Sequence, residues 1–131
     1  NHRVQVFNGN GKYETQWVNM HRPCGLYCCG GPKPRFIIGE LGAMGPVNRF
    51  HPNIGPRLSI VDSEGKVIAR LGGEDGPGLE MGKFIAPHGL AVDARGDIYV
   101  GEVSYTEYPR LFPDHAIRWR MRSLQKLQKL G

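Results

Sequence analysis

The fold of this chain is decided by the stretch PHGLAVDARGDIYVGEV at residues 87–103. Its opening PHGL repeats the PCGL of residues 23–26, and its closing GEV repeats the GEL of residues 39–41. A third match lies upstream, where RVQVF followed by Gly11-Lys12 returns as RLSIV followed by Gly65-Lys66. Matches that keep the same order along the chain indicate one repeated unit of several strands.

Each unit is predicted to hold four strands, a to d, joined by glycine-bearing turns. Strand a is expected at residues 89–93 and strand b at 98–102, while strand c is expected at 57–62 and strand d at 66–71. Short antiparallel strands in units of about 40–45 residues are the plan of a β-propeller blade. The predicted fold class is therefore all-β, with antiparallel four-stranded blades of a partial β-propeller.

The repeat divides the chain into parts of unequal completeness. Residues 1–20 supply strands c and d of one blade, and residues 21–71 form a full blade with an insertion at 43–56. A Gly- and Pro-rich linker follows at 72–86, and residues 87–131 form an incomplete last blade.

The last blade contains a long segment between strands b and c, followed by a final segment rich in leucine. Residues 104–121 are expected to form a long loop between strands b and c. The segment around 123–130 has leucines at helical spacing, but the repeat places a c strand there, and we favour the strand.

Composition excludes several classes of protein. The 131 residues include 19 Gly and 10 Pro, which argues against an all-helical protein. No apolar run approaches the roughly 18 residues of a membrane-spanning helix, so no membrane partner is expected. The net charge of +5 equals the charge of five cations near the end of the chain, Arg118, Arg120, Arg122, Lys126 and Lys129. We interpret them as a local solvated basic face and expect no nucleic-acid partner.

The three cysteines, Cys24, Cys28 and Cys29, are too few for a disulfide scaffold or a four-cysteine zinc site. We interpret them as small buried hydrophobic residues. The chain begins at Asn1 without a leader, as a processed product, a domain or a fragment would, and the compartment is left open.

These residues resemble the NHL-repeat six-bladed β-propellers. The family's signature strand reads roughly Asn-x-Arg-hydrophobic-x-Val-Phe, which NHRVQVF at residues 1–7 matches, and residues 87–100 are similar to the family's inner hairpin. The closest enzyme likeness is to bacterial relatives of peptidyl-α-hydroxyglycine α-amidating lyase. The chain supplies only about two and a half blades of such a ring. Its exposed sheet edges therefore predict self-association or a missing remainder of the ring.

The predicted strand order gathers the five histidines on one rim, where a strands begin and b strands end. His88 opens the innermost strand of its blade, and the resemblance implies that a His at this position ligates zinc together with histidines of other blades. Cys24 holds the equivalent position in the full blade, and His51 lies in the insertion on the same rim. These three are the candidate metal ligands. Gly89 stands where the lyases have an Asp that serves calcium, so the resemblance supports zinc more than calcium. The alternative is that His88 is a hydrogen-bonded structural residue at the start of its strand.

Glu40 and Glu102 end the two b strands at matching positions on this rim. They are candidates for contact with metal or substrate, or for acid–base catalysis; the alternative is a repeated structural role as acceptors of backbone N–H groups. Tyr105 and Arg49 are candidates by location for a proton donor and an anion clamp. The candidate catalytic set is thus Tyr105, Glu102 and Arg49.

Two classes of function remain open. The first is a non-catalytic propeller module that binds a small molecule, a peptide or a protein through its loop-rich rim. The second is a zinc-dependent lyase resembling peptidyl-α-hydroxyglycine α-amidating lyase. Propellers host both kinds of function, so enzymatic activity is left undecided.

Overall fold

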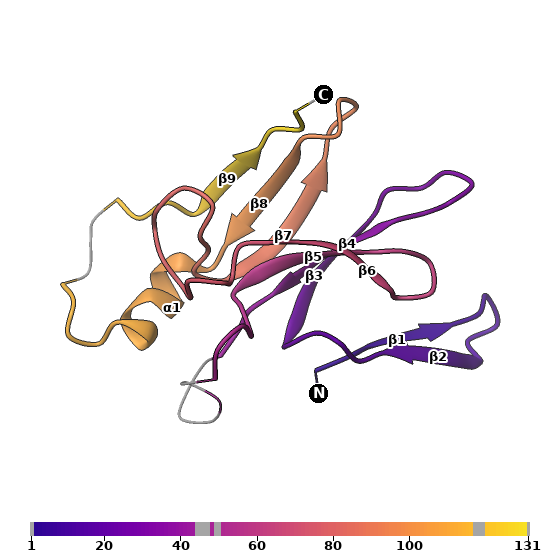
Figure 1. Ribbon diagram of the computed structural model, residues 1–131, viewed down its shortest axis with the longest axis horizontal. Coiled ribbons are helices and arrows are strands. Elements are labelled where there is room, and N and C mark those ends of the chain that lie inside the picture. The colour runs from indigo at the N-terminus through magenta and orange to yellow at the C-terminus, as the bar shows by residue number, and fades with distance from the viewer. Residues whose placement is uncertain (1, 44–47, 49–50, 117–119, 131) are drawn as a thin grey trace.

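The computed structural model describes residues 2–43, 48, 51–116 and 120–130, in which nine strands and one short helix form (Figure 1). The strands make three antiparallel sheets in chain order. The first sheet contains β1 (Val4–Phe7) and β2 (Tyr13–Trp17); the second contains β3 (Pro23–Cys28), β4 (Phe36–Glu40), β5 (Arg57–Val61) and β6 (Val67–Leu71); the third contains β7 (Pro87–Val92), β8 (Ile98–Glu102) and β9 (Leu124–Leu127). The predicted all-β class is confirmed.

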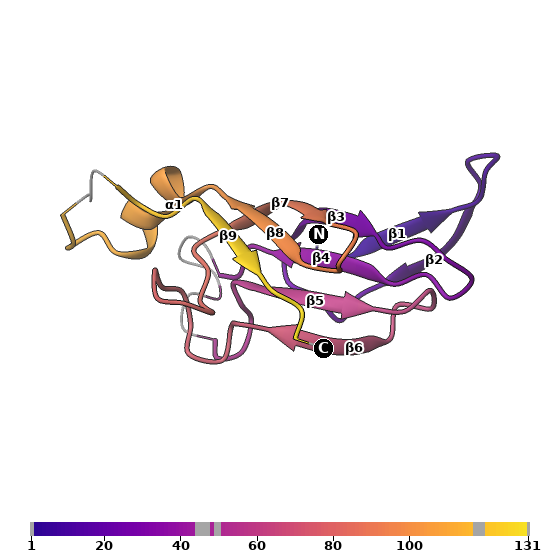
Figure 2. The same ribbon diagram turned by 90° about the horizontal axis from the view of Figure 1, so that it is seen from above.

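Each strand pairs with its neighbour in sequence, so every sheet is a meander. The third sheet packs on the second mainly through β7, which contacts both β3 and β4 (Figure 2). The strands expected at 98–102, 57–62 and 66–71 are present within one residue of those limits, and the segment 123–130 contains a strand, as favoured.

Three hairpin turns share one structure, which explains why the repeat is visible in sequence. In each turn the side chain of Asn8, Asp62 or Asp93 accepts hydrogen bonds of 2.9–3.0 Å from the N–H groups two and four residues later. A glycine three residues on adopts a positive φ, for example 81° at Gly65 and 87° at Gly96. Such Asx turns need a short polar side chain and a residue that tolerates the left-handed region.

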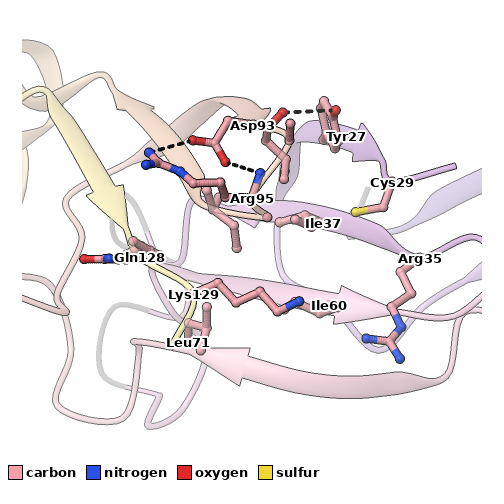
Figure 3. Close-up of a pocket in the computed structure, with 15 residues that line it drawn as sticks. Tyr27, Cys29, Arg35, Ile37, Ile60, Leu71, Asp93, Arg95, Gln128 and Lys129 are labelled. Atoms are coloured by element: carbon pink, nitrogen blue, oxygen red, sulfur yellow. Dashed lines mark hydrogen bonds and ion pairs between the residues drawn. The ribbon is translucent and has the colours of Figure 1, made fainter. Parts of the chain in front are cut away.

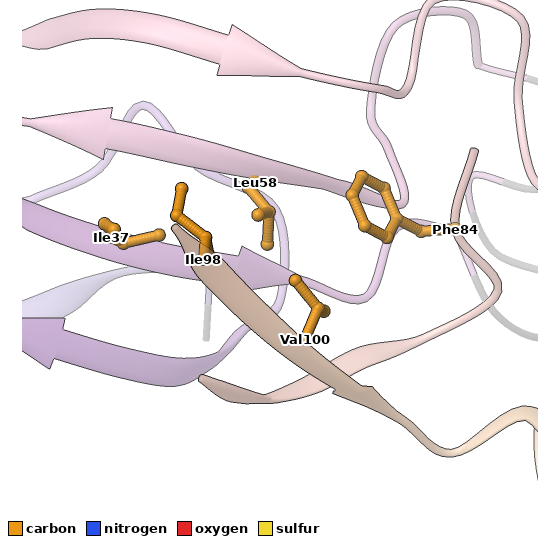
Figure 4. Close-up of a cluster of buried hydrophobic side chains, with 5 residues drawn as sticks. All are labelled: Ile37, Leu58, Phe84, Ile98 and Val100. Atoms are coloured by element: carbon orange, nitrogen blue, oxygen red, sulfur yellow. The ribbon is translucent and has the colours of Figure 1, made fainter. Parts of the chain in front are cut away.

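The main core lies between the second and third sheets and contains Ile37, Leu58, Phe84, Ile98 and Val100 (Figure 4). Because side chains alternate along a strand, Ile37 belongs to this core while Ile38 belongs to a second one, between the first and second sheets. Phe84 is fully buried although it lies in the expected linker. Burying one such side chain contributes about 1.5–3 kcal/mol, so the end of the linker is part of the core.

Two glycines let the third sheet approach the second closely. A Cβ atom at Gly39 would lie 2.6 Å from the carbonyl oxygen of Pro87, and one at Gly25 would collide with the carbonyl oxygen of His88. Both atoms belong to the backbone of β7, which cannot move aside as a flexible side chain can. Glycine at these positions therefore sets the spacing between the two sheets.

The expected loop at 104–121 was wrong in its first half, because helix α1 (Ser104–Leu111) forms there. Its buried residues include Glu107 and Tyr108, and Tyr108 packs in a third cluster with Ile85, Ala86 and Met121. The packing of this face explains the helix despite Pro109 in its last turn.

The interpretation of the basic residues as a solvated face was also wrong for one of them, Arg122. Arg122 donates hydrogen bonds of 2.7–3.0 Å to the carbonyl oxygens of Leu79, Glu80 and Lys83, which fastens the linker to the third sheet. Lys126 is exposed, and it forms an ion pair with Asp97 at 2.7 Å.

Candidate functional site

Cys24 and His88 lie at the same irregularity in two sheets. In the third sheet Pro87 pairs with Glu102 and Gly89 with Gly101, which leaves His88 as an extra residue. In the second sheet the register shifts between Pro23 and Leu26, the segment that contains Cys24. Such bulges redirect a side chain out of the sheet, and both residues are exposed. Because β3 and β7 are in contact, the two bulges lie on neighbouring strands.

The described residues contain no group of three or more His, Cys, Asp and Glu side chains that could hold a metal ion. Burial raises the pKa of the Cys24 thiol, against a smaller opposing effect of Arg22. The thiolate that zinc requires is therefore disfavoured at neutral pH. His51 lines a separate cavity of about 200 Å³ with Asn53, Glu74 and other residues, and neither Cys24 nor His88 lines it. Cys24 and His88 thus lie on two strands that contact each other, His51 lines a cavity apart from both, and zinc binding stays a prediction.

The cysteines were expected to be buried, and this was wrong: Cys24, Cys28 and Cys29 are all free and exposed. Cys24 and Cys28 lie on β3, an edge strand of its sheet whose buried face is occupied by Gly25. Strand alternation then directs Cys24 to the other face.

Glu40 is fully buried and holds the start of its sheet together. Its carboxylate accepts a 2.5 Å hydrogen bond from the backbone N–H of His21, two residues before β3. It also pairs with the buried guanidinium of Arg57 through bonds of 3.0 and 2.9 Å, and it accepts the hydroxyl of Ser59. Every oxygen of this carboxylate is therefore engaged.

Glu102 makes the same connection in the third sheet. It accepts bonds of 2.6 and 3.2 Å from the N–H groups of Ile85 and Ala86, which precede β7, and a 2.7 Å bond from the Gln125 side chain. Arg122 is its charged neighbour, at 3.7 Å. The repeated role as backbone acceptor is confirmed, although the N–H groups belong to the segment entering the same sheet and not to the next blade. A catalytic role for Glu102 stays a prediction, and it would require breaking these bonds.

The histidines do not form one cluster. The rings of His2 and His21 stack with centroids 4.2 Å apart, and Nδ1 of His2 accepts a 3.1 Å bond from the N–H of Arg22. Burial, followed by the charges of His2 and Arg22, lowers the pKa of His21. His115 instead stacks on Phe112 beside α1, with its Nδ1 3.2 Å from the hydroxyl of Tyr108. The rim thus contains several separate histidine environments.

Tyr105 and Arg49 are the two remaining candidate catalytic residues. Tyr105 is half exposed on α1, and its hydroxyl accepts a 3.2 Å bond from the N–H of Met121. Arg49 lies outside the described residues.

Sequence reasoning missed a cleft at the opposite end of the sheets from the rim (Figure 3). The cleft has a volume of about 550 Å³. Its walls are apolar residues of the second and third sheets, including Ile37, Ile60, Leu71, Ile98 and Leu127. Arg35, Arg95 and Lys129 also line it, and its one carboxylate, Asp93, is paired with Arg95 at 3.4 Å. Within the described chain the cleft is therefore apolar in its walls and cationic in its polar lining.

No family model matches this chain, and no match is found among curated proteins. In the described part of the chain, no helix has the length and apolar character needed to cross a membrane.

Proposed function

We propose that this chain is a binding module made of NHL-type β-propeller blades, which joins further blades through an open sheet face and binds its ligand at the rim. The observation that carries the proposal is a face of the third sheet that matches, position by position, the covered face of the second.

The strand registers align the two faces without ambiguity. Gly39 pairs with Leu58 in the second sheet, and Gly101 pairs with Leu124 in the third. Leu58 is fully buried against the third sheet, whereas Leu124 is 66% exposed. An exposed leucine beside a glycine repeats the surface on which β7 packs.

The glycines of the two faces differ in the same way, covered in the second sheet and open in the third. A Cβ atom at Gly101 would meet only atoms of Gly89 in its own sheet, at 3.8 Å or more, and one at Gly89 would meet nothing within 4 Å. The space that β7 occupies over Gly25 and Gly39 is thus open over Gly89 and Gly101. A second copy of the chain, or the remainder of a ring, would supply the missing inner strand.

At the rim, Cys24 and His88 offer exposed side chains on adjacent inner strands, which supports this place for a small molecule or peptide. The alternative of a zinc-dependent lyase rests on the resemblance and on the exposure of His88. It requires metal ligands beyond those of the described residues.

The test for association is light scattering coupled to size-exclusion chromatography, from micromolar to submillimolar protein. We expect the wild type to self-associate with rising concentration and Gly101→Arg to remain monomeric with unchanged circular dichroism. Tyr13→Arg, an exposed change on the first sheet, is the control and is expected to associate as the wild type does. A wild type that is monomeric throughout overturns self-association.

The test at the rim is metal content by elemental analysis of protein purified without chelator or His tag, beside His88→Ala and the control His115→Ala. Stoichiometric zinc lost only in His88→Ala would favour the lyase and justify assays on α-hydroxyglycine peptides. Absence of metal in every sample would leave the binding module.

A further inference from the structure

Seven of the eight members of the core between the first and second sheets have a counterpart in the core between the second and third sheets. Seven positions correspond through the strand registers and the spacing to Pro23 and Pro87: Val4 and Leu58, Val6 and Ile60, Trp17 and Leu71, Met20 and Phe84, Phe36 and Ile98, Ile38 and Val100, Val61 and Leu127. The eighth member, Val67 of β6, has no counterpart there, and the core between the second and third sheets has four members of its own, Tyr27, Ile37, Leu90 and Val92. The third sheet has no fourth strand among the described residues, so nothing stands in that place.

The cleft lies at the place of the absent residue. Val67 pairs with Val61 across β5 and β6, and it packs in the core that contains Trp17, Val6 and Phe36. The neighbours of Val67 are thus Val61, Trp17, Val6 and Phe36. Their counterparts, in the same order, are Leu127, Leu71, Ile60 and Ile98, and all four counterparts line the cleft. The cavity therefore includes the place that the first residue of a fourth strand would take.

The outer edge of β9 is open for backbone pairing as well. In the second sheet the N–H of Asp62, just beyond β5, donates a 3.0 Å bond to the carbonyl oxygen of Lys66. Gln128 follows β9 at the corresponding position, and β9 pairs only with β8 in the described chain. An edge strand with free donors and acceptors accepts another strand by β-augmentation.

We propose that the cleft and the edge of β9 form a docking site for an extended peptide of another polypeptide, antiparallel to β9. Its apolar side chain enters between Leu127 and Ile60, and its residues alternate between half-buried and exposed positions as those of β6 do. Arg35 and Lys129 line the end of the cleft where the peptide enters, and neither has an ion pair with a described residue. A peptide with an acidic residue shortly before its apolar residue is therefore preferred.

The probe is a fluorescent peptide with the sequence of residues 64–71, EGKVIARL, which has this pattern. Fluorescence polarisation compares it with the same peptide carrying Val67→Asp. We expect the wild-type chain to bind the first peptide and to bind the second about tenfold or more weakly, because the apolar side chain loses its cavity. Equal binding of both peptides overturns the proposal.

Two chain variants test the location. Ile60→Trp fills the cleft and is expected to abolish binding, whereas Ile68→Trp, at a half-exposed isoleucine of β6, is the matched control and is expected to bind as wild type. Gly101→Arg blocks the open face but is expected to keep peptide binding, so failure of the blade association and failure of this site are distinguishable. No binding by the wild type overturns the proposal; if Ile60→Trp then dissolves a wild-type dimer, the occupant is a second copy of the chain.

Discussion

The second and third sheets begin with the same motif and end in different surroundings. In the second sheet the glycine face is covered by β7, four strands complete the sheet, and Glu40 faces a buried arginine. In the third sheet the glycine face is open, the described residues supply three strands, and Glu102 faces a partly exposed arginine. Equivalent residues thus serve a closed interior in one sheet and an available surface in the other. Residues that repeat in the sequence therefore need not contribute equally to the free energy of unfolding.

The largest expected contrast lies between the two buried glutamates. Glu40→Gln leaves the guanidinium of Arg57 buried without its charged partner, and we expect a loss of about 3–5 kcal/mol in the free energy of unfolding. Glu102→Gln retains Gln125 and a partly solvated Arg122, and we expect about 1–3 kcal/mol. Urea denaturation followed by circular dichroism measures both. Equal losses would mean that the charge of Arg57 is not what distinguishes the sheets.

The next contrast uses two leucines at one position. Leu58→Ala empties a fully buried site, for which we expect a loss of about 2–5 kcal/mol. Leu124→Ala changes a side chain that is 66% exposed, and we expect a change within about 0.5 kcal/mol. The same denaturation experiment applies, at a concentration where the chain is monomeric. A large loss in Leu124→Ala monomers would show that this face is already covered within one chain.

The paired glycines give a smaller contrast with a clear sign. Gly39→Ala places a Cβ atom against the backbone of Pro87, and we expect a loss of about 1–3 kcal/mol from overpacking. Gly101→Ala meets ordinary contacts only, and we expect stability to stay equal or to rise slightly, because alanine restricts the unfolded chain. Thermal unfolding of the two variants decides the matter. If Gly39→Ala is as stable as wild type, the close approach of β7 does not require glycine.

The smallest expected contrast is in how the stability of β9 and of the second sheet depends on pH. Hydrogen bonds from Lys126 and from the N–H of Lys129 lower the pKa of Asp97, against an opposing effect of burial. The resulting stabilisation of β9 is full above the pKa of an unfolded Asp, about 3.9, and is lost as pH falls through the lower folded value. At the corresponding position of the second sheet stands Arg35, which has no such partner among the described residues.

Amide exchange of β9, measured from about pH 5 down to about pH 2.5, is expected to quicken relative to β5 after correction for intrinsic rates. Asp97→Asn is expected to remove this pH dependence. An unchanged ratio in the wild type would exclude a role for this ion pair in holding β9.

Much of the fold was predictable because the repeat lies in the residues that make turns and close approaches. Asp62 and Asp93 cap turns in the same way, and Gly39 and Gly101 end equivalent strands. Those roles depend on local chemistry, which a sequence displays directly. The shared position of Glu40 and Glu102 predicted their common structural role for the same reason.

The parts that were missed depend on contacts between distant segments. Helix α1 has Ser104 three residues before Glu107, a spacing typical of helix starts, but the hydroxyl of Ser104 donates to the carbonyl oxygen of Arg122 instead of capping the helix. Phe84 is buried only because two sheets meet over it. The incomplete last unit predicted an exposed sheet edge, but neither the cleft nor its cationic lining was predicted.

The connections before the last strands of the two sheets differ greatly in span. β6 follows β5 through a tight turn at 62–66, whereas β9 reaches β8 only after the chain has passed through residues 103–123. Closing the longer loop costs more conformational entropy, and the contacts that repay this cost form late. We therefore expect β9 to join its sheet last during folding and to leave it first in partial unfolding. Because β9 borders the cleft, the peptide site would then be assembled, and lost, in the final folding step.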